Sequence, residues 1–337
     1  MRHNVLIPKL PAADELLPYL RRIDGARWYS NGGPLVQELE RRMGGLAVSS
    51  ATLGLELAAH CIFRGRVRIP AFTFVATATA LLRAGLKPVL CDVDETWALS
   101  DIDEDSMPVC PFGACVAPGG LVDAAAGWGN QAEGVRVYSL HATKSLPAGE
   151  GGMIVGPPEL LDRISKLRNF GLDGSMVSEA GTNAKMSEYH AAVGLASLDA
   201  WEETKEARLR LAAAYRERLG DDIVTLPNAG VQASFPVLVD NAQSVVEDMA
   251  SRGIETRRWY TPTLDRHPAF AHLEREGDLT GIANAHAIAE RLLCLPFHLH
   301  LTERDVDEIC DVFAWAVDRN TPKRLFERAA WTFASHL

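Results

Sequence analysis

One lysine of the sequence lies in a setting that suits covalent chemistry. Lys144 ends the pattern Ser139-x-x-x-x-Lys144, just past the apolar run Val135–Leu140, which predicts a buried strand, and the glycine-rich turn Gly149–Gly152 follows. Burial disfavours the charged form of lysine and lowers its pKa. A lysine in such a place is typical of a neutral amine that forms a Schiff base with a carbonyl compound.

A carboxylate precedes this lysine at the end of another predicted strand. Asp123 directly follows the apolar run Gly120–Val122. A lone Asp of this kind is more often a turn or helix cap, and a lone Ser-x-x-x-x-Lys is more often a solvated loop. Together and in this order, the two residues match pyridoxal phosphate, whose ring nitrogen needs a carboxylate to stay protonated and whose aldehyde needs an amine.

The elements around these residues alternate between strand and helix patterns. Such alternation predicts an α/β layer structure with a mainly parallel sheet, in which ligands bind at the carboxyl ends of strands. Asp123 and the Ser139–Lys144 segment both fall at such ends. The predicted strands are Val67–Pro70, Pro88–Val93, Pro108–Phe112, Gly120–Val122, Val135–Leu140 and Gly152–Val155, with helices at Thr52–Phe63 and Thr73–Arg83.

The second half of the chain predicts a separate, smaller α/β domain. Met186–Leu219 lacks proline and is rich in Ala, Leu, Glu and Arg, which predicts one or two long helices leading out of the first domain. We therefore predict a large domain over residues 1–219 and a small domain over 220–337. The elements predicted after the long helices are strands Gln232–Val239 and Ile254–Tyr260, helices Gln243–Arg252, Ala283–Leu293 and Glu303–Val317, and an amphipathic terminal helix over Thr321–Leu337.

Composition excludes several classes of function. The 337 residues carry a net charge of −10, which argues against binding to nucleic acid or to an anionic membrane. Six cysteines without a CxxC pair and ten histidines without a ligand pattern predict no metal site and a reducing compartment. With no signal-peptide pattern and no apolar run long enough to cross a bilayer, a cytoplasmic protein is expected.

Short motifs in a fixed order resemble the DegT/DnrJ/EryC1/StrS family of pyridoxal-phosphate sugar-nucleotide aminotransferases. The resemblance implies fold type I, the aspartate aminotransferase-like architecture, with a large mostly parallel mixed sheet and a smaller C-terminal α/β domain. The motifs are Ser30–Pro34, Ser50–Thr52, Pro70–Thr77, Gly85–Asp94, Asn169–Gly171, Gly181–Glu188, Gly253–Thr256, Tyr260–Pro262 and Cys294–Phe297, with Asp123 and Lys144 between them.

The resemblance also implies roles for individual residues. Lys144 would bind the cofactor covalently and shuttle the proton, and Asp123 would pair with the ring nitrogen. Phe74 would cover one face of the ring, and Asn183 would reach the phosphate in the partner of a homodimer. The phosphate would be held by Ser50, Ala51, Thr52 and Ser139, and the substrate by Lys185, Arg257, Arg258 and Tyr260.

Three positions depart from the family pattern. Ala51 stands where the family usually has glycine, so the phosphate loop is expected to differ slightly. Ala126 replaces a His or Gln, which removes a polar contact near the cofactor ring. Leu264 replaces a His found in many members. These departures bear on substrate detail more than on the class of reaction.

The resemblance implies conversion of a nucleotide-linked keto-sugar to an amino sugar. The run Arg257–Pro262 resembles the branch that makes 4-amino-4,6-dideoxy sugars, so dTDP-4-keto-6-deoxy-D-glucose and L-glutamate are the expected substrates, for surface polysaccharide such as O-antigen. Amination of a 3-keto position, or of a UDP- or GDP-sugar, is the alternative within the family. Dehydratase relatives replace the lysine with histidine, which Lys144 argues against.

Two further alternatives come from other classes of protein. A nicotinamide-dependent sugar oxidoreductase would also fit the α/β alternation, but the GxGxxG fingerprint is absent. A non-catalytic regulatory or DNA-binding protein is disfavoured by the acidic charge and by the lack of a basic recognition helix.

Overall fold

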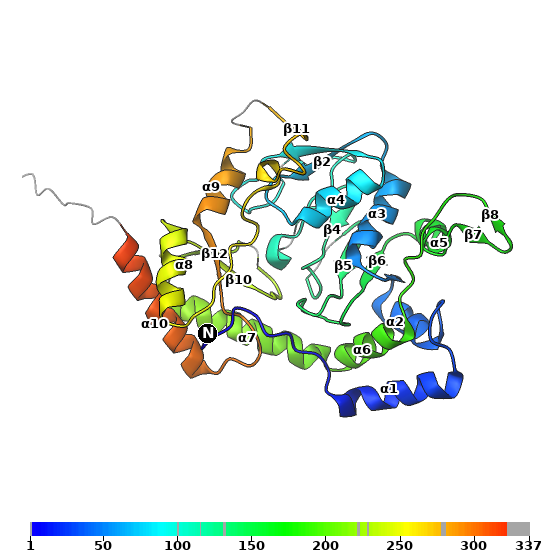
Figure 1. Ribbon diagram of the computed structural model, residues 1–337, viewed down its shortest axis with the longest axis horizontal. Coiled ribbons are helices and arrows are strands. Elements are labelled where there is room, and N and C mark those ends of the chain that lie inside the picture. Colours follow the sequence, from blue (N-terminus) through cyan, green and yellow to red (C-terminus); the bar gives the residue numbers. More distant parts are fainter. Residues whose placement is uncertain are drawn as a thin grey trace, which may run out of the picture.

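The computed structural model describes residues 2–99, 101–114, 116–130, 133–220, 223–227, 229–277 and 281–321 (Figure 1). The predicted terminal helix therefore lies outside the described residues, apart from Thr321. No helix of this described part is long and apolar enough to cross a bilayer.

A mixed sheet forms the centre of the larger part of the molecule. Strands β4 (Val122–Asp123) and β5 (Arg136–Ser139) are parallel, and β6 (Gly152–Val155) runs antiparallel between β5 and β1 (Leu46–Val48). Strands β2 (Arg66–Pro70), β3 (Lys87–Cys91) and β11 (Glu274–Arg275) are parallel to one another. Single bridges join the two groups through the segment between them, at Arg68–Ser106 and Val109–Asp123. The α/β fold class with a mostly parallel mixed sheet is confirmed.

Helices cover both faces of this sheet, which explains the continuous apolar runs of its strands. Along β5, Val137 packs into one apolar core and Tyr138 into another. Along β6, Ile154 and Met153 divide in the same way. The first core includes helices α3 (Ala51–Ile62), α4 (Val75–Arg83) and α5 (Pro158–Leu167); the second includes α1 (Ala13–Ala26), α2 (Pro34–Met43) and α6 (Glu188–Asp199).

A further apolar core lies at the other end of the molecule, reached by the long helix α7 (Figure 1). Tyr215 of α7 is fully buried there and stacks on Phe235, with ring centroids 4.8 Å apart. The elements of this region are α7 (Trp201–Leu219), β9 (Val224–Thr225), β10 (Phe235–Leu238), α8 (Ala242–Ser251), β12 (Leu292–Leu295) and α10 (Glu303–Asn320). Helix α9 (Ala283–Arg291) precedes β12 but packs into the first core. The division into domains at residue 219 stays a prediction.

Three predicted elements differ from the structure. The helix predicted over Ala283–Leu293 ends at Arg291, and Leu292–Leu295 forms strand β12, which pairs with β10. Ile254–Tyr260 makes only single bridges, at Ile254 and Arg257, and the peptide bonds Trp259–Tyr260 and Thr261–Pro262 are cis. Pro108–Phe112 bridges only at Val109 before a 3-10 turn begins at Pro111. Short apolar runs do not distinguish strand from helix by periodicity, which accounts for the first difference.

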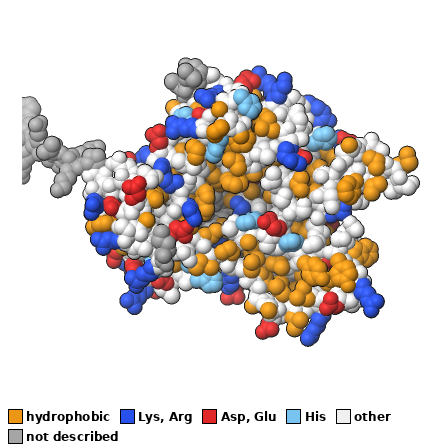
Figure 2. Space-filling model, in the orientation of Figure 1, with side chains coloured by type: hydrophobic (Ala, Val, Ile, Leu, Met, Phe, Trp, Pro, Cys, Tyr) orange, Lys and Arg blue, Asp and Glu red, His pale blue; other side chains and the backbone are white. Residues whose placement is uncertain are grey.

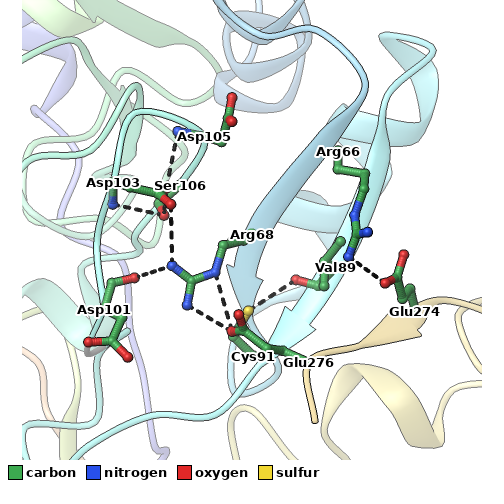
Figure 3. A network of polar contacts seen from close by, with 10 residues as sticks. All are labelled: Arg66, Arg68, Val89, Cys91, Asp101, Asp103, Asp105, Ser106, Glu274 and Glu276. Atoms are coloured by element: carbon green, nitrogen blue, oxygen red, sulfur yellow. Dashed lines mark hydrogen bonds and ion pairs between the residues drawn. The ribbon is translucent and has the colours of Figure 1, made fainter.

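The edge of the sheet is covered by a segment far away in the sequence (Figure 3). Strand β11 pairs with β3, so that Glu274 lies opposite Val89. Arg66 forms an ion pair with Glu274, and Arg68 forms one with Glu276 at 2.7 Å. Pairing and charge at an edge strand disfavour pairing with other chains, and exposed ion pairs of this kind orient a segment more than they stabilise it.

Candidate active site

A cavity of about 380 Å³ opens where β4 and β5 end and α3 begins. This position agrees with the rule that ligands of parallel sheets bind at the carboxyl ends of strands. Its volume falls in the range of small-molecule sites. Eight of the predicted site residues line it: Ser50, Ala51, Thr52, Phe74, Asp123, Ser139, Lys144 and Tyr260.

Asp123 is the buried acid of this cavity. Its side chain is 4 % exposed; the Thr77 hydroxyl donates to Oδ2 at 2.7 Å, and the Ala125 N–H donates to Oδ1 at 3.1 Å. Burial raises the pKa of Asp123, whereas these two donors and the nearby Lys144 ammonium lower it. The two donors thus favour the carboxylate in a place where desolvation opposes it.

Lys144 lies in the turn that follows β5 and faces the same cavity. Its backbone N–H bonds the carbonyl of His141 at 2.9 Å, which closes a tight turn beyond the strand. Burial lowers the pKa of the Lys144 ammonium, and the charge of Asp123 opposes this shift. A lowered pKa increases the neutral fraction of the amine, which is the form that attacks a carbonyl and accepts a proton.

The N-terminus of α3 offers the cavity a site for an anion. Ser50 caps the helix by accepting the Leu53 N–H at 3.2 Å. The N–H groups of Ala51 and Thr52 lie in the first turn, where the helix itself provides no carbonyl to accept them. Unpaired amides and the helix dipole favour a phosphate there. Ser139 lines the cavity beside them, and its hydroxyl accepts the His141 N–H at 3.3 Å.

Glycine is required where β6 passes this helix end. A Cβ on Gly152 would lie 2.7 Å from the backbone nitrogen of Ala51, closer than side chains tolerate. Ala51 itself is the first residue of α3 and does not have a positive φ, so alanine fits this position without strain. The backbone at this position does not require glycine. The presence of Ala51 therefore gives no backbone reason for the phosphate loop to differ from that of the family.

Aromatic rings form other walls of the cavity. Phe74 precedes α4 and is 56 % exposed, unusual for so apolar a side chain, and its exposed surface faces the cavity. Tyr260 stacks on Phe112 with centroids 4.9 Å apart. The side chain of Ala126, where the family carries a polar residue, lines the cavity and offers no hydrogen bond.

Four predicted residues lie outside this cavity. Asn183 is exposed and bridges to Asn169, and the Lys185 amine lies 4.5 Å from the centroid of the Phe170 ring. Arg257 is exposed and pairs with Glu255 at 2.6 Å. Arg258 instead donates to carbonyls at the end of α9 and beyond it, those of Ala289, Glu290 and Leu292, at 2.7–3.1 Å.

Sequence reasoning missed two buried threonines and a buried acid. Thr77 contacts Asp123 directly, and its hydroxyl lies 3.0 Å from that of Thr73. Their i, i+4 spacing at the start of a helix was the available signal. Glu188, 1 % exposed, accepts the N–H groups of Leu35 and Val36 at 2.8 and 3.0 Å and so caps α2.

No metal centre accompanies these groups in the portion of the chain that the structure describes. There, no set of three or more His, Cys, Asp or Glu side chains is placed to hold a metal ion. His141 lies near Glu150, with Nε2 and Oε1 3.6 Å apart, and its Nδ1 lies 2.9 Å from the Thr143 hydroxyl. These contacts shape the turn that carries Lys144.

Comparison with known proteins places this chain in a family. The model of the DegT/DnrJ/EryC1/StrS aminotransferase family matches residues 12–104 and 121–314. A dTDP-4-amino-4,6-dideoxy-D-glucose transaminase of Shigella dysenteriae is 30% identical, over 88% of this chain and 94% of the relative.

Two solved structures share both fold and sequence with the chain. DesI, solved in the presence of its TDP-sugar product, superimposes with a TM-score of 0.84 at 29% identity, covering 95% of this chain and 94% of DesI. A Bacillus cereus protein described as a PLP-dependent aminotransferase gives 0.86 at 27% identity, covering 93% and 100%. The resemblance inferred from the short motifs is confirmed, and with it fold type I: the chain belongs to the DegT/DnrJ/EryC1/StrS aminotransferase family.

Proposed function

We propose that this sugar aminotransferase works with pyridoxal 5'-phosphate bound in the described cavity. The observation that carries the proposal is the pairing of a buried Asp123 with a partly buried Lys144 at one cavity, beside the N-terminus of α3. An acid for the ring nitrogen, an amine for the aldehyde and amides for the phosphate are the three groups that this cofactor requires. The residues present therefore fit it.

Each part of the cofactor has a residue of this chain to hold it. Asp123 would bind the ring nitrogen, Lys144 the aldehyde carbon, and Phe74 one face of the ring. Ser139, Thr52 and the amides at the start of α3 would hold the phosphate. When bound, the cofactor supplies an electron sink that allows the amino group to pass from donor to ketone.

Lys144 and Asp123 have opposite tasks in protonation. The lowered pKa of Lys144 increases the fraction of neutral amine, so that Nζ can take up and return a proton as a general base should. The donors on Asp123 favour its carboxylate form, which would keep the ring nitrogen protonated. The apolar walls around Phe74 and Tyr260 reduce the access of water to both groups.

The proposed substrate is a nucleotide-linked keto-sugar, dTDP-4-keto-6-deoxy-D-glucose, with L-glutamate as amino donor. The names of the Shigella relative and of DesI, which binds a TDP-sugar product, support this choice. A 3-keto sugar or a UDP- or GDP-sugar is the alternative, in keeping with the spread of substrates that the family resemblance implies. The cytoplasm and a role in surface polysaccharide or O-antigen synthesis remain part of the proposal.

The direct test is a substrate panel. The purified protein is incubated with pyridoxal phosphate, glutamate and dTDP-, UDP- or GDP-linked 3- and 4-keto sugars, and the products are read by mass. We expect the dTDP-4-keto-6-deoxy sugar to gain an amino group in exchange for its keto oxygen. Turnover of a different sugar would correct the substrate, and no amino sugar from any member of the panel would contradict the proposed function.

The diphosphate of such a substrate needs positively charged side chains, and the cavity of one subunit contains few of them. Among the lining residues that the structure describes, only Lys144 and His141 have side chains able to carry positive charge. Lys185 and Arg257 lie outside the cavity with exposed surface, whereas Arg258 is bound to the end of α9. We therefore place the substrate diphosphate near Lys185 or Arg257.

Replacing the correct cation should weaken sugar-nucleotide binding selectively. A charge-assisted hydrogen bond contributes roughly 1.5–3 kcal/mol, so Lys185→Ala or Arg257→Ala should raise the KM for the sugar nucleotide about 10-fold or more. The half-reaction with glutamate should change less. Lys205→Ala, at an exposed pair with Glu202, is the matched control. If neither variant changes this KM, the diphosphate binds elsewhere.

An exposed apolar face lies beside two of the residues outside the cavity, Asn183 and Lys185. Apolar side chains gather over the hairpin of β7 (Leu172–Asp173) and β8 (Met176–Val177) at one end of the molecule, and over the region of α1 and α6 below it (Figure 2). Met176, Val177 and Phe170 are 70%, 56% and 50% exposed, and Tyr29 stacks on Tyr189. Apolar patches of this kind mark protein interfaces. We propose that this face joins two copies of the chain and brings Asn183 to the partner's cofactor.

Mixing two inactive variants tests this composite site. Lys144→Ala loses the reacting amine and Asn183→Ala loses the proposed phosphate contact, which would serve the neighbouring subunit. In a mixed dimer, one of the two sites would carry both defects and the other neither. Each mixed dimer should therefore show about half the activity of a wild-type dimer. Subunit exchange is verified with two differently tagged chains. Proven exchange without recovered activity would place both residues in the site of one chain.

A further inference from the structure

Two buried threonines connect Asp123 to the wall of the cavity through hydrogen bonds. Thr77, 0% exposed, lies in the first turn of α4, and its hydroxyl is 2.7 Å from Asp123 Oδ2. Thr73, 2% exposed, precedes α4; its hydroxyl is 3.0 Å from that of Thr77, and the residue lines the cavity. Both hydroxyls are removed from bulk water, so each must find its partners inside the protein.

The chemistry of these groups sets the direction of both hydrogen bonds. A hydroxyl has one proton to donate, and an ionised carboxylate can only accept. Thr77 must therefore donate to Asp123, and its oxygen is left to accept the proton of Thr73. Thr73 then has no proton for the cavity, and what it can present there is an acceptor.

We infer that Thr73 and Thr77 form a hydroxyl relay that holds Asp123 ionised and oriented toward the ring nitrogen of the proposed cofactor. Thr77 is a positioning residue and Thr73 supports it. Thr77 donates to one carboxylate oxygen and Ala125 to the other, and each oxygen keeps a lone pair for the ligand. The inference rests on the proposed function, because it assigns a task to Asp123 in cofactor binding.

The relay matters because the surroundings of Asp123 oppose its charge. Burial raises its pKa, and among the described residues only Lys144 supplies a nearby positive charge. Tyr260 lies close enough to interact electrostatically with Asp123 and is itself held neutral, since burial raises its pKa. In the cofactor-free protein, the Thr77 hydroxyl, the Ala125 N–H and Lys144 are therefore the groups that favour the carboxylate against burial.

The test compares threonine variants that differ in the hydroxyl but not in volume. Thr77→Val keeps the shape and removes the donor, Thr77→Ser keeps the donor, and Thr73→Val removes the support. Thr79→Val is the matched control, because Thr79 lies on the same helix and its hydroxyl donates to the Val75 carbonyl at 2.8 Å instead of to Asp123. The dissociation constant for pyridoxal phosphate and the pH dependence of the bound cofactor's absorbance are measured for each folded variant.

We expect Thr77→Val to weaken cofactor binding about 10-fold or more, as for loss of a hydrogen bond to a charged group, and to shift the absorbance-versus-pH profile. Thr73→Val should act in the same direction with a smaller effect. Thr77→Ser and Thr79→Val should resemble the wild type. A wild-type dissociation constant and profile in Thr77→Val would overturn the relay, as would a defect in Thr77→Ser as large as that of Thr77→Val.

A measurement on the cofactor-free protein separates this inference from the proposed function. Infrared spectra of protein labelled with 13C at the aspartate carboxyl, with Asp123→Asn used to assign the band, follow the protonation of Asp123. Its carboxylate should become protonated at higher pH in Thr77→Val, and in Thr73→Val if Thr77→Val fails to fold. An unchanged titration would refute the relay, whereas failure of the wild type to bind pyridoxal phosphate would refute the proposed function alone.

Discussion

Lys144→Ala is expected to abolish transamination while the protein stays folded. The side chain is the only lysine amine lining the cavity among the described residues, and it would both attach the cofactor and move the proton. A positioned acid–base group alone contributes roughly 10²–10⁴-fold to rate, so activity should fall at least that far. Product formation from glutamate and the keto-sugar, measured by mass, gives the result.

The variant should keep a stability close to that of the wild type. Loss of the Lys144 amine relieves the cost of burying an ammonium, but it also removes the charge that favours the Asp123 carboxylate. Lys166→Ala, at an exposed lysine paired with Asp162 and Asp173, is the control and should keep full activity. Near-normal transamination by Lys144→Ala would remove this residue from the mechanism.

Asp123→Asn is expected to give the second largest effect. The amide has nearly the same shape but lacks the negative charge that pairs with a protonated ring nitrogen. Loss of one hydrogen bond between charged groups is worth roughly 1.5–3 kcal/mol, which corresponds to about a 10- to 150-fold lower rate. The cofactor should still bind at high concentration. A rate within a few-fold of the wild type would mean that another group holds the ring nitrogen.

The same substitution should stabilise the cofactor-free protein at neutral pH. Burial raises the folded-state pKa of Asp123, so above that pKa the buried charge is a cost to folding. The cost diminishes as pH falls through the folded pKa and is absent below the unfolded value of 3.8. Thermal melts should therefore show a higher Tm for Asp123→Asn at pH 7, with a difference that shrinks on acidification. A lower Tm at pH 7 would mean that Thr77, Ala125 and Lys144 more than offset the burial.

The parts of the fold that could be predicted are those with strong local patterns. The apolar runs at β2, β3, β5 and β6 are continuous because helices cover both faces of the sheet, and the long helices α6 and α7 lack proline. Helix α1 offered a contrary signal, since Pro18 lies inside it. Strand β12 could not be separated from the helix before it, because its pairing with β10 comes from a distant part of the chain.

The candidate site also contains both residues that the sequence could predict and contacts that it could not. Lys144, Asp123, Ser139 and Thr52 follow or begin regular elements, so their meeting at one edge of the sheet could be expected from topology. The contact of Thr77 with Asp123 depends on how α4 packs against β4, which no local pattern records. Arg258 looked available for a substrate, but its guanidinium binds carbonyls that only the folded chain brings near.

Reductive trapping of the cofactor tests the central claim most directly. The protein is incubated with pyridoxal phosphate, reduced with borohydride, digested, and its peptides are sequenced by mass spectrometry. We predict one phosphopyridoxyl group per chain, on Lys144, with loss of the visible absorbance and no labelling of Lys144→Ala at stoichiometric cofactor. Stoichiometric labelling of a different lysine, or none at all, would contradict the account of this site.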